Sequence, residues 1–337
     1  MTILFLTKLF YPHIGGVEKH VEEVSRELIK KGHRIIVLTL KHDPKLPEIE
    51  TSGGVKIIRL PYSESKWIIW KNLWQKRSLI KEVDIIHCHD VFFWYLPFKF
   101  LFPKKPVYTT FHGWEGDFPI PQKNIFIRRL SEKLSWGNIC VGGYIKKYYG
   151  AKPNYIIYGA ITLEPDGRRG RVLSKTFKEC IFIGRLEKDT GMEDYLKALK
   201  TIKQKNGLKI TFVGDGSYRS QAEKIGLVTG MVKTIKPYLK KPAYIFASSY
   251  LTILEAMVAK RSVFALYHNS LKKDYLQQFP GARYMRISNS ADELIKQFNN
   301  ALKNPKKIDQ MINRAYHFAQ KQTWDKVAKK YLDLWKL

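Results

Sequence analysis

The sequence predicts an α/β protein with two doubly wound domains that face each other. Short apolar runs typical of buried strands alternate with amphipathic helical segments along the chain. The alternation runs through about residue 160 and then starts again. A chain of 337 residues is long enough for two domains that each bury their own core. We therefore expect two parallel sheets with crossover helices.

The first half opens with the apolar run TILFLT, which we expect to be a buried strand. It is interrupted by Lys8 and followed by Tyr-Pro, so it does not resemble a cleavable leader. A helix should come next, because apolar residues recur at helical spacing before a glycine: Val17, Val21, Val24, Leu28 and Gly32. Five later runs read as further strands: RIIVLT, VKIIRL, VDIIHCHD, VYTTFHG and NICVGG.

The second half repeats the pattern with the strand-like runs ECIFIGR, KITFVGDG, AYIFAS and SVFALY. The polar, Gly/Pro-bearing segment Thr162–Lys175 is the expected linker. We therefore expect an N-terminal domain over 1–163 and a C-terminal domain over 176–315. Residues 316–337 should form a C-terminal helix that packs back towards the N-terminal domain. Its apolar side would carry Val327, Tyr331 and Leu334.

Charge and composition narrow the possible partners. The net charge is +29, of which residues 1–160 carry +11 (25 basic, 14 acidic) and residues 161–337 carry +18 (34 basic, 16 acidic). Such a field favours nucleic acid, nucleotide phosphates or an anionic membrane surface. The isolated cysteines suit a reducing cytoplasm. The longest apolar run, Val91–Phe102, is interrupted by Pro97 and too short to span a bilayer.

Several expected strand ends carry glycine or polar residues, where open parallel sheets bind ligands. Gly15 and Gly16 precede the first helix, so they either leave amides for an anion or form a turn with positive φ. His87 and His89 share one face of a strand, as a metal pair or as polar residues at a strand end. His112 follows the next strand, with a structural role as the alternative.

The second half offers two charged candidates. Arg185 follows a strand and could bind a diphosphate, or it could pair on the surface with Glu187 or Asp189. Glu255 lies near the start of a short helix between two strands. It either closes a capping box with Thr252 or binds a ligand hydroxyl. The FVGDG turn by itself predicts only a loop.

In this order, the motifs resemble those of the retaining GT-B glycosyltransferases of family 4, also described as glycosyl transferases group 1. The resemblance rests on FYPHIGGVEKHVEEVSRELIKKGHRIIVLT, DIIHCHD, TTFHG, FIGRLEKDTG, FVGDG and LEAMVAKRSVF. It covers nearly the whole chain and implies two facing Rossmann-like domains. It also implies transfer of a sugar from a nucleoside diphosphate to an acceptor hydroxyl.

The resemblance assigns roles to individual residues. His112 would approach the transferred sugar and Arg185 would neutralise the diphosphate, and these two are the expected catalytic residues. Glu255 would accept hydrogen bonds from the ribose. The expected donor-binding residues are Gly15, Gly16, Arg185, Lys188, Thr190, Gly214, Asp215, Gly216, Ser248, Ser249, Thr252, Ile253, Leu254 and Glu255. The amides of Thr252–Leu254 would face phosphate, and Gly214–Gly216 would lie near the base.

At three positions the chain departs from the family pattern. The Asn-Gly that is usual between the domains reads Tyr158-Gly159 here. Ala247 stands where the family often carries a glutamate that contacts the sugar, so Ser248 or Ser249 would approach instead. Thr190 stands where a lysine is usual, so Lys188 would have to supply the charge. A catalytically degenerate nucleotide-sugar-binding protein is therefore an alternative to an active enzyme.

The expected partners are a UDP-, GDP- or ADP-sugar and a glycan or lipid-linked acceptor. No cofactor or metal is expected, because no DxD-type carboxylate pair ends a strand. The segment Ser65–Lys81 interleaves tryptophans with basic residues and precedes the aromatic run from Val91. These aromatics either pack in the N-terminal core or bind the inner face of an anionic membrane. A nucleic-acid-binding protein is a further alternative, although no nucleic acid is expected for the enzyme.

Overall fold

The computed structural model describes residues 1–162 and 179–337, which form two compact units. The first unit contains Met1–Glu115, Pro119–Ile157 and Trp324–Leu337, and the second contains Gly116–Phe118 and Tyr158–Thr323. Most of the expected linker, Thr162–Lys175, lies outside the described residues. The C-terminal segment expected to begin at residue 316 is divided, because 316–323 belong to the second unit and only Trp324–Leu337 belong to the first.

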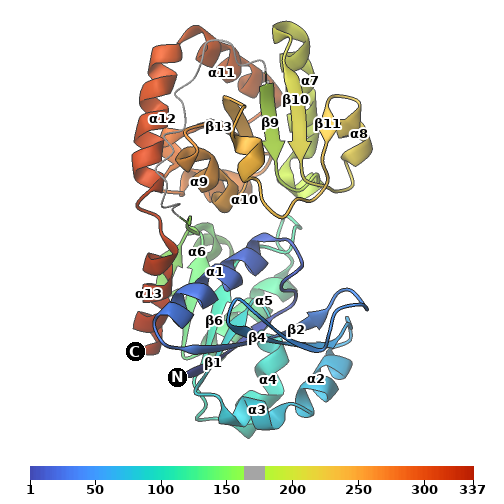
Figure 1. Ribbon diagram of the computed structural model, residues 1–337, viewed down its shortest axis with the longest axis vertical. Helices are drawn as coiled ribbons and strands as arrows, with labels where there is room; N and C mark the ends of the chain where they lie inside the picture. The colour runs from blue at the N-terminus through green and yellow to red at the C-terminus, as the bar shows by residue number, and fades with distance from the viewer. Residues whose placement is uncertain (163–178) are drawn as a thin grey trace. The chain divides into compact units, whose positions relative to one another are not determined.

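The first unit is an eight-stranded sheet with the order β3-β4-β2-β1-β5-β6-β7-β8 (Figure 1). All its strand pairs are parallel except β3 with β4. Its elements are β1 Thr2–Thr7, α1 Gly16–Lys30, β2 Arg34–Lys41, β3 Ile49–Ser52, β4 Val55–Pro61, α2 Lys66–Trp74, α3 Arg77–Glu82, β5 Ile85–His89, α4 Phe92–Leu101, β6 Val107–Phe111, α5 Gln122–Leu134, β7 Gly137–Val141, α6 Tyr144–Tyr149, β8 Tyr155–Ile157 and α13 Trp324–Trp335.

Helices cover both faces of this sheet because its central strands are apolar on both sides. Leu4 and Leu6 of β1 belong to a core with α2, α3 and α4. Phe5 points to the opposite face, where its ring lies against Tyr331 and Trp335 of α13. The helix α13 also packs on α1. The last helix of the chain thus completes the first unit.

The second unit is a parallel six-stranded sheet with the order β11-β10-β9-β12-β13-β14. Its elements are β9 Glu179–Ile183, η1 Lys188–Thr190, α7 Met192–Asn206, β10 Lys209–Val213, α8 Arg219–Glu223, β11 Leu227–Val228, η2 Lys236–Leu239, β12 Tyr244–Ala247, α9 Tyr250–Val258, β13 Ser262–Leu266, α10 Ser270–Gln277, η3 Ala282–Tyr284, β14 Arg286–Ser288, α11 Ala291–Lys303 and α12 Pro305–Ala319. Phe182 of β9 packs in a core with residues of α7 and α11, whereas α9 contacts β12, β13 and α12.

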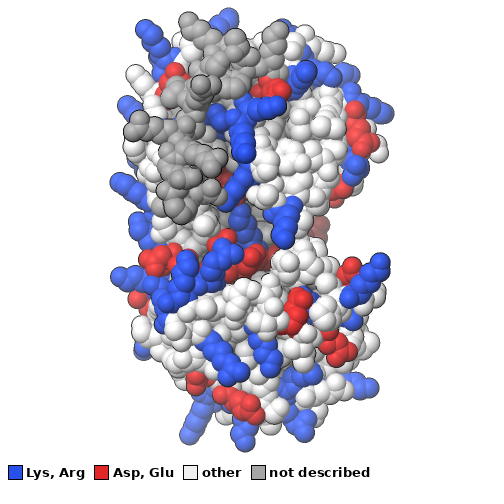
Figure 2. Space-filling model, viewed as in Figure 1, with Lys and Arg blue, Asp and Glu red and all other residues white. Residues whose placement is uncertain are grey.

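The α/β class and the parallel sheets expected from the sequence are therefore confirmed. No helix within 1–162 and 179–337 has the length and apolar character needed to cross a bilayer. Lys and Arg side chains are scattered over the visible face of both units (Figure 2).

Candidate functional site

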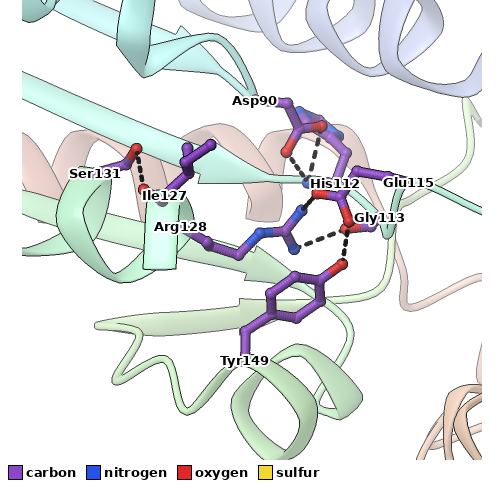
Figure 3. A network of polar contacts seen from close by, with 8 residues as sticks. All are labelled: Asp90, His112, Gly113, Glu115, Ile127, Arg128, Ser131 and Tyr149. Atoms are coloured by element: carbon purple, nitrogen blue, oxygen red, sulfur yellow. Dashed lines mark hydrogen bonds and ion pairs between the residues drawn. The ribbon is translucent and has the colours of Figure 1, made fainter. Parts of the chain in front are cut away.

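In the first unit, the loop after β6 is held by hydrogen bonds to its backbone (Figure 3). The Asp90 carboxylate at the end of β5 accepts from the His112 amide, at 3.0 and 3.3 Å to its two oxygens. From the other side, Arg128 of α5 donates to the Gly113 carbonyl at 2.7 Å and to Glu115 Oε1 at 3.0 Å. The backbone on both sides of the His112 side chain is thus fixed.

Arg128 is itself rigidly placed. It is 7% exposed, and its guanidinium carbon lies 3.7 Å from the centroid of the Tyr149 ring. Tyr149 donates to Glu115 Oε2 at 2.5 Å, which ties the same loop to α6. A buried arginine needs such partners, because an unpaired charge away from water is costly.

A cavity of about 350 Å³ opens beside this network. It is lined by Val17, Asp90, Phe111, His112, Gly113, Trp114, Glu115, Asn124, Ile127, Arg128 and Ser131. The pKa of the Asp90 carboxyl is raised to about 6, chiefly because nearby groups displace water from it, although part of the residue is exposed. The nearby Arg128 guanidinium limits that rise. The cavity therefore combines apolar walls with a carboxylate and a fixed cation, which is typical of a small-molecule site.

The histidines of the sequence motifs form one buried cluster. His89 Nδ1 lies 2.9 Å from His112 Nε2, and His87 Nε2 lies 2.7 Å from Thr110 Oγ1. His20 of α1 bonds the Tyr331 hydroxyl at 2.8 Å, and its ring lies 4.8 Å from that of His112. Burial lowers the pKa of His112 to about 3. His112 is therefore a neutral hydrogen-bonding group near pH 7 rather than a cation.

His87 and His89 do share a face of β5, as the sequence predicted, with ring centroids 5.1 Å apart. Their ring nitrogens bond Thr110, Trp335 and His112. Within the described part of the chain, no group of three or more His, Cys, Asp or Glu side chains has the arrangement needed to hold a metal ion. These contacts favour the polar strand-end interpretation over the metal pair.

Gly15 is the residue before α1, and its backbone is extended, with φ −169°. Neither Gly15 nor Gly16 has a positive φ, so the tight-turn explanation of this pair is wrong. A Cβ on Gly15 would lie 2.1 Å from Glu18 Oε2, and the Glu18 carboxylate also bonds His13 Nδ1 at 2.8 Å. A carboxylate of the chain thus already lies beside the amides that were expected to face an anion.

In the second unit, the turns after β9 and β10 are joined backbone to backbone. Gly184 N donates to Val213 O at 3.1 Å, and Leu186 N donates to Asp215 O at 2.8 Å. Gly184, Gly214 and Gly216 all have φ near +150°, a conformation that favours glycine. The backbone conformation of the turn therefore explains why glycine occupies positions 214 and 216. Asp215 pairs with Arg219 at 2.8 Å.

Arg185 lies in the first of these two turns, between Gly184 and Leu186, whose amides make the bonds to the second turn. Its side chain is 65% exposed and donates to Asp189 Oδ2 at 2.5 Å, so the expected surface ion pair with Asp189 is present. Lys188 is exposed, whereas Thr190 is 5% exposed at the end of η1. Glu187 instead accepts from the Ser217 amide and hydroxyl. Arg185 thus keeps an accessible guanidinium in a defined place.

The helix α9 begins earlier than the capping-box interpretation requires. Ser249 is the residue before the helix and donates from its hydroxyl to Thr252 Oγ1 at 2.9 Å. Thr252 lies inside the first turn, so a box formed by Thr252 and Glu255 is wrong. Glu255 is half-buried in the next turn, at helical spacing from Thr252.

The amides at the start of α9 also differ from expectation. Ile253 N donates to Ser249 O at 2.9 Å, and Leu254 follows it in the helix, so these two amides serve the helix itself. Tyr250 N donates to the Tyr275 hydroxyl at 3.1 Å. By helical geometry, the first-turn amides without an intrahelical acceptor that remain are those of Leu251 and Thr252. Of the three amides expected to face phosphate, Thr252–Leu254, only that of Thr252 is left without an intrahelical acceptor.

Within each unit the expected residues fall into one neighbourhood. In the second, the turns at Arg185, Gly214 and Ser248 follow β9, β10 and β12, which are neighbours in the sheet. In the first, Val17 at the start of α1 and His112 line the same cavity. Asp90 and Arg128 were not among the site residues predicted from the sequence. Asp90 ends the DIIHCHD run, but Arg128 lies in a helix with no local sign of burial.

Comparison with known families matches both halves of the chain. Residues 14–164 match the model of Glycosyltransferase Family 4, and residues 166–318 match that of Glycosyl transferases group 1.

Curated relatives match over shorter stretches. An uncharacterized glycosyltransferase of Methanocaldococcus jannaschii is 25% identical over 261 residues, which cover 67% of this chain and 66% of that protein. One human relative, a phosphatidylinositol N-acetylglucosaminyltransferase component, is 31% identical over 97 residues, which cover 27% of this chain and 20% of that protein. The matched stretches thus span less than two thirds of these relatives.

Solved structures match the fold over nearly the whole chain. Sucrose-phosphate synthase from Thermosynechococcus elongatus has a TM-score of 0.78 at 16% identity and covers 99% of this chain and 98% of its own. Anabaena Alr3699/HepE, solved with UDP and glucose, has a TM-score of 0.72 at 13% identity and covers 98% of this chain and 99% of its own.

Proposed function

We propose that this chain, which belongs to the GT-B glycosyltransferases, transfers a sugar from a nucleoside diphosphate to an acceptor hydroxyl with retention of configuration. The observation that carries the proposal is the arrangement of the second unit. Backbone-joined glycine turns hold Arg185 at the carboxyl edge of β9, next to the start of α9. A guanidinium and helix-start amides at such an edge suit a diphosphate.

In the proposed reaction, negative charge grows on the departing diphosphate while the sugar gains oxocarbenium character. Arg185 would stabilise the diphosphate electrostatically. Glu255 would accept from the ribose hydroxyls, and Ser248 and Ser249 would lie near the donor because they follow β12. His112, held through its backbone by Asp90, would offer a neutral imidazole to the transferred sugar. No metal has a part in this proposal.

The donor can be identified directly. A thermal-shift screen with UDP-, GDP- and ADP-sugars should give one clear stabiliser, since a ligand that binds only the folded state raises its stability. Hydrolysis of that donor with acceptor absent, and NMR of the anomeric configuration of the product, then test turnover and retention. Binding without any turnover would support the degenerate alternative that Ala247 and Thr190 suggest. If none of the UDP-, GDP- and ADP-sugars stabilises the protein, the proposal is contradicted.

The acceptor is proposed to be lipid-linked, because an aromatic and basic surface lies on α2 and α4. Some of these aromatics do pack in the core, as Trp94, Tyr95 and Phe98 are at most 1% exposed. Three other aromatics and two aliphatic side chains on the same helices form what we call the aromatic-basic surface: Trp67, Ile68, Trp74, Phe100 and Leu101, which are 46–77% exposed. The human relative is named as a subunit of a phosphatidylinositol N-acetylglucosaminyltransferase, which agrees with a lipid acceptor.

Basic side chains of α2, α3 and α4 lie over aromatic rings of this surface or of neighbouring residues. Lys66 lies over the Phe93 ring, Arg77 over Trp74 and Lys99 over Trp136. Figure 2 shows Lys and Arg side chains over the part of the first unit where Figure 1 labels α2, α3 and α4. Exposed tryptophan together with lysine is typical of shallow binding to an anionic bilayer. We propose this role for the positive charge, rather than nucleic-acid binding.

Vesicle sedimentation tests this part of the proposal. The chain should sediment with phosphatidylglycerol vesicles at low salt and much less with phosphatidylcholine vesicles. The double variant Trp67→Ser/Phe100→Ser should lose at least fivefold in binding, since each substitution removes a large exposed apolar group. Leu227→Ser, at a comparably exposed position in the second unit (67%), is the control. Equal binding of all three proteins would contradict the assigned surface.

A further inference from the structure

Lys272, in the first turn of α10, is a buried lysine. It is 4% exposed. Its Nζ donates to the Ser248 carbonyl at 2.8 Å and lies 4.2 Å from the centroid of the Tyr275 ring. The frame around it is well defined, because Tyr275 stacks on Tyr250 with ring centroids 4.0 Å apart. Tyr250 also donates from its hydroxyl to the Tyr275 carbonyl.

The position of Lys272 is at the same edge of the sheet as the proposed diphosphate site. The strands β9, β12 and β13 are neighbours, and α10 begins shortly after β13. Arg185 follows β9 and Ser248 follows β12, so Lys272 reaches from the third strand end towards the second. The helices α9 and α10 lie side by side here, as Figure 1 and the Tyr250–Tyr275 bonds agree.

A lysine is unusual at so buried a position, because lysine side chains are mostly exposed in proteins. An apolar side chain could pack on the Tyr275 ring equally well. Burial lowers the pKa of Lys272 to about 7, while Asp189 opposes that fall and Arg185 adds to it. Among the described residues, His268 and Tyr275 also face it. An incoming anion would therefore stabilise the protonated ammonium.

We propose that Lys272 is a cation of the donor site and binds an anionic group of the nucleotide sugar. This inference rests on the proposed function. The group is either the diphosphate or a carboxylate on the sugar itself. Lys272 would then supply, from α10, a second positive charge beside Arg185, in a chain where Thr190 is buried and Lys188 is exposed.

Calorimetry on the full chain tests the assignment. The ligands are uridine, UMP, UDP, UDP-glucose and UDP-glucuronate. If the thermal-shift screen selects guanosine or adenosine as the base, the corresponding series is used instead. Lys272→Met should weaken UDP binding at least tenfold and leave uridine within twofold, if the lysine binds the diphosphate. If it binds a sugar carboxylate, only UDP-glucuronate should weaken. Lys273→Met, an exposed lysine on the same helix, is the matched control and should change nothing.

The outcomes separate this inference from the proposed function. Binding by the wild type with unchanged affinities in Lys272→Met overturns the role of Lys272 alone. If the wild type binds no nucleotide of any series, both the role of Lys272 and the proposed function are overturned. Because loss of a buried side chain can distort its surroundings, Lys272→Arg is a second variant that keeps the charge and should lose less than Lys272→Met. Equal losses of diphosphate and nucleoside affinity in both variants would show a structural role and overturn the inference.

Proton uptake gives a readout that a merely structural lysine would not move. At pH 8, UDP-glucose binding should take up protons in the wild type, since the anion raises the pKa of a lysine that is largely neutral beforehand. Titrations in HEPES and Tris, which differ in ionisation enthalpy, measure the number of protons. Uptake should vanish in Lys272→Met and persist in Lys273→Met. If Lys272 binds a sugar carboxylate instead, the uptake should appear only with UDP-glucuronate. If the wild type takes up no proton with either ligand, the role is contradicted.

Discussion

Gly214 packs directly on the backbone of Gly184. A Cβ atom on Gly214 would lie 1.9 Å from the Gly184 carbonyl oxygen, well inside any possible contact, and Gly214 has φ +150°. The contact allows the turns after β9 and β10 to join by hydrogen bonds, and Arg185 follows immediately. The absence of a side chain at Gly214 is therefore a condition for the position of Arg185.

Gly214→Ala should destabilise the second unit by about 3 kcal/mol, because both the backbone conformation and the close contact are lost. The control is Gly207→Ala, which also has a positive φ (+61°) but no neighbour within 4 Å of its Cβ position. That variant should lose only about 1 kcal/mol. Thermal unfolding should show midpoints lowered by roughly 10 °C and 3 °C. Equal shifts would mean that the contact is unimportant.

Arg185→Ala should weaken nucleotide-sugar binding or turnover at least tenfold, equivalent to about 1.4 kcal/mol. The matched control is Lys197→Ala. Both side chains are 65% exposed in the second unit, and each pairs with one aspartate. The control therefore removes a similar surface charge away from the turn. Donor affinity measured by calorimetry should fall only in Arg185→Ala, and equal affinities would refute the assignment.

Glu255→Ala should also weaken donor binding tenfold or more, on the order of 1.4 kcal/mol, because a carboxylate that accepts from ribose hydroxyls is lost. The sharper readout compares the selected nucleoside diphosphate with its 2′,3′-dideoxy analogue. The wild type should prefer the ribose form, and Glu255→Ala should bind both alike. Glu223→Ala, an exposed glutamate of α8, should keep the preference. A preference retained by Glu255→Ala would rule out the ribose contact.

The buried histidines should make the first unit sensitive to acid. Burial lowers the pKa values of His20, His87 and His89 well below 6.5. Below pH 6.5 the unfolded chain binds protons that the native cluster does not, so the free energy of unfolding falls as pH falls. Each histidine contributes a slope of about 1.4 kcal/mol per pH unit until its native pKa is reached.

Thermal unfolding at pH 7.5 and 5.5, followed by tryptophan fluorescence, measures this effect. His87→Gln should reduce the difference between the two pH values, since glutamine can keep a bond to Thr110 without titrating. His317→Gln, at an exposed position in the second unit, should leave the difference as in the wild type. An identical pH dependence in wild type and His87→Gln would contradict the explanation.

The main strands could be predicted from the sequence because they are continuous apolar runs, buried on both faces of parallel sheets. Both TILFLT and SVFALY coincide closely with strands. The strands that escaped prediction are short or lie at sheet edges. β3 reads IETS, and β11 has two residues, so neither has enough apolar periodicity to stand out.

Candidate site residues such as Arg185 and His112 could be located in the sequence because each follows closely on a strand, and their roles stay predictions. The start of α9 was misplaced because Ser249 and Thr252 are both good residues to precede a helix, and only the backbone distinguishes them. Lys272 and Arg128 could not be found by pattern. Lys272 is buried against the Ser248 carbonyl, which follows β12, and Arg128 is buried against Tyr149 of α6, whereas a lysine or arginine in a helix is normally solvated.

The position of α13 in the first unit has a consequence for synthesis on the ribosome. The strands β1–β8 emerge early, but the helix that covers Phe5 and bonds His20 and His87 is translated only after the whole second unit. Until then, the nascent sheet carries an uncovered apolar and histidine-lined face. The first unit can therefore reach its final packing only after the second unit has been synthesised.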